Sequence, residues 1–298
     1  MEILRAELEY NCPTWNVTSF GFYHHADYVE ISGDGKKMYL IISGSSDCKE
    51  IFFSIISILF IYYGSFPELL KVELNGVAED TEQYNSLFFT SPHFKKECFK
   101  LHDINSSTIN EKVMEKFAQL SGYPILSLQA LVSCVYDKMM SDHKLTLLLQ
   151  VIDGLVSDDE GRSVDEKIKK QLIPNFNSKK TQQIPYAYKV YYLCDKNFFV
   201  YDDNLKILPL LQVDDIEFTR TITDTRHHNT HFTAPKVHSL EKGSDNIIYF
   251  TLIYYILRIY IIKKLDVPLS DDLIADGLRC IKNWIFGILF RNYVKTGC

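Results

Sequence analysis

The chain has 298 residues, of which 46% are hydrophobic and 23% are charged, a balance typical of a folded protein and not of a disordered one. This length accommodates one large domain or two of ordinary size, and we interpret the pattern as two. The net charge of −6 excludes a surface that is basic overall, so any contact with nucleic acid must use a local patch. Lysines do gather in one stretch, although solvated loop lysines are the commoner explanation: Lys169, Lys170, Lys179, Lys180 and Lys189.

The first third of the chain has the alternating pattern of strands, with one helix among them. Strands are predicted at Thr18–His24, Ala26–Ser32, Lys37–Ser43, Leu69–Leu74 and Ser86–Thr90, with a hairpin turn at Gly33-Asp34-Gly35. Ser45-Ser46-Asp47 is a plausible helix cap, and Gly64 a plausible stop, so Cys48–Tyr63 is predicted to be a helix on this sheet. Residues 1–104 are therefore predicted to form a smaller α+β accessory domain.

From Ser106 onward the apolar period becomes helical, beginning with a Ser/Thr cap. The polar segment 157–183 is the best candidate for a mobile excursion, and Asn204–Leu211 for a second break. Helices are predicted at Ile109–Leu120, Ile125–Met140, Lys144–Val156, Pro185–Tyr192, Asp214–His231, Ser244–Lys264 and Ser270–Tyr293. The fold class is therefore predicted to be mainly α, with residues 105–298 forming an up-and-down helical bundle with one long insertion.

The cysteines and the hydropathy pattern indicate in which cell compartment the protein is expected. The seven cysteines are widely spaced and form no Cys-x-x-Cys pair, so neither a disulfide framework nor a thiolate zinc site is indicated, and a reducing cytoplasm fits best. The first residues lack the basic start and apolar core of an export signal. The apolar runs Ile51–Tyr63 and Ile247–Ile262 are shorter than the roughly 20 residues of a membrane span, so both are interpreted as core helices.

Arginine and histidine cluster in one segment, which is the strongest local anomaly in the chain. Arg226 is followed by His227, His228 and His231. A guanidinium is always charged and its planar fork fits phosphate oxygens, while an imidazole can gain or lose a proton near neutral pH. These two groups suffice to cleave RNA without a metal, if the 2′-hydroxyl attacks the phosphate that the arginine holds. Such a reaction leaves a cyclic phosphate and a 5′-hydroxyl, and cannot cut DNA.

The segment from Ile222 to Phe232 resembles the Arg-x4–6-His signature of the HEPN superfamily, and most of all its ApeA-type branch. The resemblance covers roughly residues 105–298. Arg226 and His231 match the two defining positions, and His227 follows the arginine where the family usually has Asn, His or Asp. Asn229 lies between them and is included as a candidate site residue. The order of helices from 144 to 293 also follows the family.

The resemblance implies further residues and partners. The family's earlier helix carries an acidic residue that points toward the arginine, and the matching run from Leu147 to Gly154 offers Asp153. Such domains commonly dimerise and many are RNA-cutting toxins or antiviral effectors. The implied protein is a metal-independent endoribonuclease without a cofactor, a cytoplasmic homodimer that binds RNA. A regulatory protein partner is implied for the N-terminal domain.

Several alternatives stay open from the residues alone. Arg220 with His227 also fits the motif spacing, and Arg226 could instead be a solvated helix end paired with Asp224 or Asp215. Asp153 could belong to a cap at a Gly154 break. The domain could also be a non-catalytic HEPN scaffold, or a metal hydrolase in which His227 and His231 supply ligands.

Tyrosines offer a base-stacking surface as one further possibility. Those of the run 247–262 are best explained by core packing. One of the four that precede the Arg-His segment could reach an RNA base, although half-buried tyrosines with bonded hydroxyls are more usual: Tyr186, Tyr188, Tyr191 and Tyr192.

Overall fold

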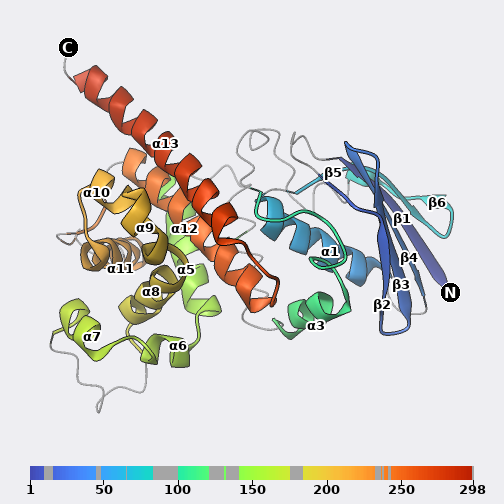
Figure 1. Ribbon diagram of the computed structural model, residues 1–298, viewed down its shortest axis with the longest axis horizontal. Coiled ribbons are helices and arrows are strands. Elements are labelled where there is room, and N and C mark those ends of the chain that lie inside the picture. Colours follow the sequence, from blue (N-terminus) through green and yellow to red (C-terminus); the bar gives the residue numbers. More distant parts are fainter. Residues whose placement is uncertain are drawn as a thin grey trace. The chain divides into compact units, whose positions relative to one another are not determined.

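The computed structural model shows a six-stranded antiparallel sheet near the N-terminus and helices after it (Figure 1), so the chain is broadly α+β. The residues it describes are 1–9, 16–44, 48–64, 66–82, 100–120, 131, 141–174, 184–231, 236, 238–240 and 243–296, and of residues 141, 142, 231, 244 and 291–296 it describes only the backbone. The strand predicted at Ser86–Thr90 and nearly all of the helix predicted at Ile125–Met140 lie outside the described residues.

The chain divides into two compact units. The first comprises Met1–Ser121 and Ile261–Leu273, and the second comprises Gly122–Tyr260 and Ile274–Cys298. These limits differ from the predicted domains 1–104 and 105–298. Two contacts within the first unit involve residues beyond 104: the hydroxyl of Tyr62 donates to the carbonyl of Thr108 at 2.5 Å, and Asp266 forms an ion pair with Lys116 at 3.1 Å.

The sheet of the first unit has the strand order β2-β3-β4-β1-β5-β6. Its strands are β1 (Glu2–Glu9), β2 (Phe20–His24), β3 (Asp27–Gly33), β4 (Lys37–Gly44), β5 (Glu68–Leu74) and β6 (Val77–Ala78). The predictions for β2, β3, β4 and β5 are confirmed. The central strand β1 was not predicted, although Leu4, Ala6 and Leu8 are buried at the alternate positions that a half-covered strand requires.

One face of the sheet forms the core of the first unit. Across neighbouring strands, Leu4 is opposite Ile42 and Ala6 is opposite Leu40, and all four are buried. Helix α1 (Cys48–Tyr63) packs against β1 and β4, as predicted for this run, and ends at Gly64 with a φ of +74°. A positive φ is cheap for glycine, so this residue stops the helix. Helix α3 (Glu111–Gln119) packs on α1 and is capped by Asn110, not by the Ser/Thr cap that the pattern suggested.

The second unit is built from helices. They are α5 (Ser141–Leu155), α6 (Asp158–Arg162), α7 (Glu166–Leu172), α8 (Tyr186–Cys194), the π-helical turn η2 (Asp195–Phe199), α9 (Val200–Leu205), α10 (Ile207–Leu211) and α11 (Asp215–His231), with most of α12 (Gly243–Lys264) and α13 (Asp271–Thr296). The predictions for α5, α11, α12 and α13 are confirmed to within a few residues.

Two predicted irregular segments are wrong in part. Residues 158–162 and 166–172 form α6 and α7, because Ser157 and Glu160 bond reciprocally as a capping box and Asp165 caps the second helix. The break predicted at Asn204–Leu211 is mostly helical: α9 ends at Leu205, and the buried carboxylate of Asp202 accepts hydrogen bonds from the first amides of α10. Composition misled at α6 and α7, since short capped helices can be almost entirely polar, whereas α10 is apolar and depends on the cap that Asp202 provides.

Among the described residues, one helix is long and apolar enough to cross a membrane by length and composition. The apolar stretch of this helix is Asp245–Lys264 in α12, and 78% of it is buried within the chain. Burial of this extent is what the core helix of a water-soluble protein shows, in agreement with the interpretation of Ile247–Ile262 as a core element.

Candidate functional site

Helix α11 carries the predicted motif, and contacts made before Arg226 anchor the helix in the second unit. The carboxylate of Asp214 accepts from the amide of Glu217 at 2.8 Å, which caps the helix. Phe218 is fully buried, and its ring stacks on Tyr249 of α12 at 5.1 Å between centroids. The hydroxyl of Thr225 accepts from the amide of Leu240 at 3.0 Å. These contacts fix the helix directly before Arg226.

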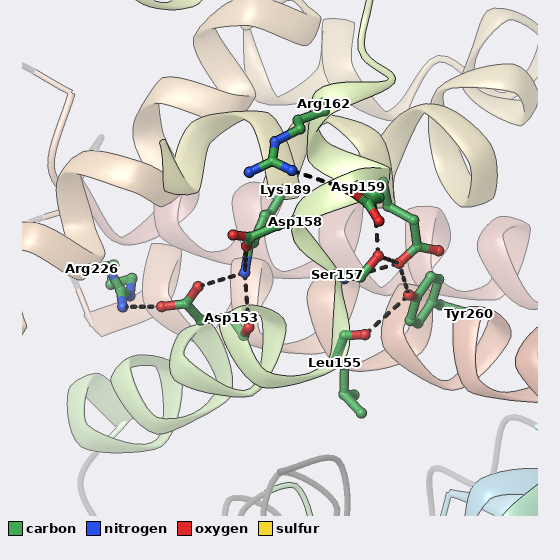
Figure 2. Close-up of polar contacts among 10 residues, drawn as sticks. Asp153, Leu155, Ser157, Asp158, Asp159, Arg162, Lys189, Arg226 and Tyr260 are labelled. Atoms are coloured by element: carbon green, nitrogen blue, oxygen red, sulfur yellow. Dashed lines mark hydrogen bonds and ion pairs between the residues drawn. The ribbon is translucent and has the colours of Figure 1, made fainter. Parts of the chain in front are cut away.

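Arg226 is held by a carboxylate from α5. Its Nη2 donates to Oδ2 of Asp153 at 2.8 Å, and its side chain is 24% exposed (Figure 2). The structure thus brings together two of the candidate site residues, Arg226 and Asp153. Asp153 does not begin a cap, since α5 continues through Gly154 to Leu155.

A tyrosine supports the same guanidinium from a second side. The Cζ of Arg226 lies 4.2 Å from the ring centroid of Tyr186, the first residue of α8, and the hydroxyl of Tyr186 donates to the carbonyl of Leu149 at 2.6 Å. Burial raises the pKa of Tyr186 well above 10, so its hydroxyl stays protonated; the charge of Arg226 opposes this shift and that of Asp153 adds to it. The ring is thus a fixed platform under the arginine.

Lys189 holds the other oxygen of Asp153. It lies one turn beyond Tyr186 on α8, its side chain is only 9% exposed, and its Nζ lies 3.2 Å from Oδ1 of Asp153 and 2.9 Å from Oδ1 of Asp158. Figure 2 shows these side chains in a row, with the carboxylate of Asp153 between the two cations. We call Arg226, Asp153, Lys189 and Asp158 the charge cluster. Its two positive and two negative charges cancel formally, and Lys189 is not one of the solvated lysines that the sequence suggested.

A second set of contacts fixes the turn that joins α5 to α6, next to the charge cluster. The hydroxyl of Tyr260, on α12, shares its one proton between Oε2 of Glu160 at 2.8 Å and the carbonyl of Leu155 at 3.1 Å (Figure 2). The same glutamate accepts from the amide and the hydroxyl of Ser157 at 2.9 Å each. Asp153 and Asp158 flank this turn, so the contacts also fix the spacing between their carboxylates.

The remaining motif residues are placed by the helix itself. His227, His228 and Asn229 are half-buried on α11. In an α-helix Asn229 and Thr230 share the face of Arg226, whereas the Cα of His231 lies about 140° around the axis and about 7.5 Å along it. The ring of His231 lies outside the described residues, so the predicted convergence of Arg226 and His231 stays a prediction.

Arg220 and Arg226, the two arginines that fitted the motif, have different contacts in the structure. Nη2 of Arg220 donates to the carbonyl of Gln171, the next-to-last residue of α7, at 2.6 Å, and Arg220 has no ion pair among the described residues. Asp224 pairs with Lys236 at 3.4 Å and not with Arg226. Of the two arginines, Arg226 alone combines a carboxylate with an aromatic platform.

Sequence reasoning missed the roles of Tyr186 and Lys189. A signal was present, because the two residues are three apart on one predicted helix and therefore share a face. That this face meets Asp153 could not be read from a pattern, since it depends on how α5 and α8 pack.

The described residues hold no candidate metal site, and the cavity beside α11 is not lined by Arg226. Among the described residues, which exclude the ring of His231, no three His, Cys, Asp or Glu side chains are arranged to hold a metal ion. A cavity of about 390 Å³ lies along another part of α11, where its lining includes Thr221, His238, Leu240, Asp245 and Tyr249 but not Arg226. Comparison with protein-family models, curated proteins and solved structures found no match.

Proposed function

We propose that the chain is a metal-independent endoribonuclease of the HEPN class. One observation carries the proposal: Arg226 is fixed between the carboxylate of Asp153, at 2.8 Å, and the ring of Tyr186, at 4.2 Å, on the helix that also bears His231. An arginine held in one orientation can bind a phosphate without losing side-chain entropy when it does so.

The chemistry follows from the residue types. Arg226 binds the scissile phosphate and stabilises the charge that develops on it, while the ring of His231 takes the proton of the attacking 2′-hydroxyl or gives one to the leaving 5′-oxygen. Asp153 orients Arg226, and His227 and Asn229 are proposed to complete the site. The products are a 2′,3′-cyclic phosphate and a 5′-hydroxyl. No metal or cofactor takes part in these steps.

The order of elements supports the assignment to this class. The acid-bearing helix α5 is followed by the variable stretch from α6 to α10, then by α11 with the motif, and then by the long helices α12 and α13. We propose that these helices form a HEPN bundle and that the sheet-bearing N-terminal region is its accessory domain. We also propose that the protein is cytoplasmic, that it acts as a homodimer on RNA, and that it serves as a toxin or antiviral effector under a regulatory partner.

The test is cleavage of RNA by the purified chain and two variants. Arg226→Ala is expected to lower the cleavage rate about 10²- to 10³-fold and His231→Ala about 10²- to 10⁴-fold, with unfolding transitions close to that of the wild type. Arg220→Ala is the matched control, because Arg220 lies on the same helix and contacts Gln171 instead of Asp153. Undiminished cleavage by both alanine variants, or equal loss in the control, would reject the proposal.

A second candidate is a HEPN scaffold that binds a partner and cuts nothing. The formal neutrality of the charge cluster favours it, because Asp153 already occupies one N–H of Arg226 and cancels its charge. This reading predicts that the wild type leaves RNA intact at every protein concentration, and that Arg226→Ala still forms the same oligomer. Cleavage that Arg226→Ala abolishes contradicts it.

A further inference from the structure

One threonine hydroxyl of α11, that of Thr230, differs from the others in its hydrogen bonding. The helix carries five threonines, and four of them have a hydrogen-bond partner. Thr219 donates to the carbonyl of Asp215 and Thr223 to that of Thr219, each at 2.8 Å, while Thr225 accepts from Leu240 and Thr221 bonds to Tyr249. The hydroxyl of Thr230 is buried and has no partner in the part of the chain that the structure describes.

One turn earlier on the same helix, Arg226 has a second unsatisfied group. Its Nη2 is bound to Asp153, but its Nε is buried and has no hydrogen-bond partner among the described residues. Residues four apart on a helix are neighbours on one face, so the two unsatisfied groups belong to the same strip of α11. No other stretch of α11 has two such groups among its described side chains.

A buried polar group without a partner is uncommon in folded proteins and usually marks a bound water, an ion or a functional site. Here the chemistry of the pair is specific. The Nε of Arg226 is a charged donor, and a hydroxyl can donate as well. Two donors, one of them charged, suit an oxygen atom that bears negative charge.

We propose that Thr230 is a further binding residue of this site, and that its hydroxyl and the Nε of Arg226 together bind one non-bridging oxygen of a phosphate. The proposal rests on the proposed function, because it identifies that phosphate as the scissile phosphate of the RNA. Asp153 binds Nη2 and the ring of Tyr186 packs against the guanidinium, so the orientation of the Nε–H is fixed while its hydrogen bond stays unmade among the described residues.

Three variants test the role of the hydroxyl. Thr230→Val keeps the shape of the side chain and removes the hydroxyl, and Thr230→Ser keeps the hydroxyl. Thr223→Val is the matched control on the same helix, since its hydroxyl already has the carbonyl of Thr219 as a partner. Thr230→Val is expected to lower kcat/KM for RNA cleavage about ten- to one-hundred-fold, while Thr230→Ser and Thr223→Val stay within about threefold of the wild type.

If the hydroxyl of Thr230 does not bind the substrate, the variants give a different pattern of cleavage rates. Thr230→Val would then cut RNA like the wild type, because losing an unsatisfied buried hydroxyl does not harm the fold, and that result overturns the proposal. The unfolding transition of each variant is recorded so that a loss of folding is not mistaken for a loss of binding.

Binding of inorganic phosphate, measured by calorimetry, separates this proposal from the proposed function. Phosphate that binds the wild type and Thr230→Ser, and binds Thr230→Val at least tenfold more weakly, supports the assignment even if no RNA is cut. If the wild type cuts RNA but Thr230→Val matches it in cleavage and in phosphate binding, the ribonuclease stands and Thr230 is excluded. Should the wild type neither cut RNA nor bind phosphate, both proposals fail.

Discussion

The inner face of the sheet and the charge cluster around Arg226 are built in opposite ways. In the sheet, buried apolar side chains lie opposite one another across the strands, as Ala6 and Leu40 do. Around Arg226, two cations share the carboxylate of Asp153, while Lys189 also pairs with Asp158 and Arg226 also lies on the ring of Tyr186. Both arrangements are specific, but the sheet is stabilised by the removal of apolar area from water, whereas opposed charges that are half-exposed stabilise a fold little.

This difference indicates where the molecule carries function. A stable fold would be reached more simply with apolar residues at the positions of the charge cluster. The cluster instead fixes the orientation of one guanidinium, whose Nε, like the hydroxyl of Thr230, is buried and has no hydrogen-bond partner among the described residues. We infer that the sheet is organised for stability and the cluster for positioning a cation.

The largest effect is expected from opening a cavity in the sheet. Leu40 is fully buried, so Leu40→Ala is expected to lower the free energy of unfolding by about 2–5 kcal/mol in urea denaturation. The rate of RNA cleavage per folded molecule should stay at the wild-type level. A loss of stability below about 1 kcal/mol, or a specific loss of cleavage, would contradict the assignment of stability to the sheet and of activity to the charge cluster.

Neutralising Asp153 is expected to act on activity more than on stability. Asp153→Asn removes the charge that orients Arg226, so cleavage should fall about ten- to one-hundred-fold. Asp159→Asn is the control, because among the described residues the one ion pair of Asp159 is with the exposed Arg162. If Asp153→Asn cuts RNA faster than the wild type, Asp153 competes with the substrate and does not position the arginine.

Removing the charge of Lys189 is expected to have a moderate effect on stability. Lys189→Met keeps the apolar stem but leaves Asp153 with Arg226 alone and removes the lysine that pairs with Asp158, and an unpaired carboxylate is costly in proportion to its burial. Both carboxylates are about half-exposed, so we expect a loss of about 1–2 kcal/mol and not the larger cost of a fully buried pair. Lys167→Met, at an exposed lysine of α7, should be neutral within about 0.5 kcal/mol.

The smallest effect is a pH dependence in the first unit. Burial lowers the pKa of His102 below its usual 6.5, so the folded chain keeps this ring neutral while the unfolded chain takes up a proton. Stability from this residue is therefore present above pH 6.5 and is lost as the pH falls from there through the folded pKa. His102→Phe should lose less stability than the wild type between pH 7 and pH 5 in thermal unfolding. An identical pH dependence in the two proteins would contradict this assignment.

Much of the fold could be predicted, because most strands and long helices have a clear period and clear ends. The alternation of β3 and β4 and the glycine after α1 are examples. The strand β1 was missed although Leu4, Ala6 and Leu8 alternate with Arg5 and Glu7, which is the pattern of a half-covered strand. The helices α6 and α7 escaped because caps, not apolar residues, define them.

The site could be predicted only in part. Residue chemistry and family resemblance pointed to Arg226 and to Asp153, and the two are in contact. Tyr186, Lys189 and Thr230 could not be assigned in the same way, because their roles depend on tertiary packing and on which hydrogen bonds are left unmade. Neither property is encoded in a local pattern.

The chemistry of the RNA ends tests the central claim most directly. The purified chain would be incubated in excess EDTA with an RNA of defined sequence and with the same RNA carrying a single 2′-deoxynucleotide at the cut position. We predict cleavage that EDTA does not inhibit, products with 2′,3′-cyclic phosphate and 5′-hydroxyl ends, and no cut at the deoxynucleotide. Cleavage that EDTA abolishes, or products with 5′-phosphate ends, would contradict the account.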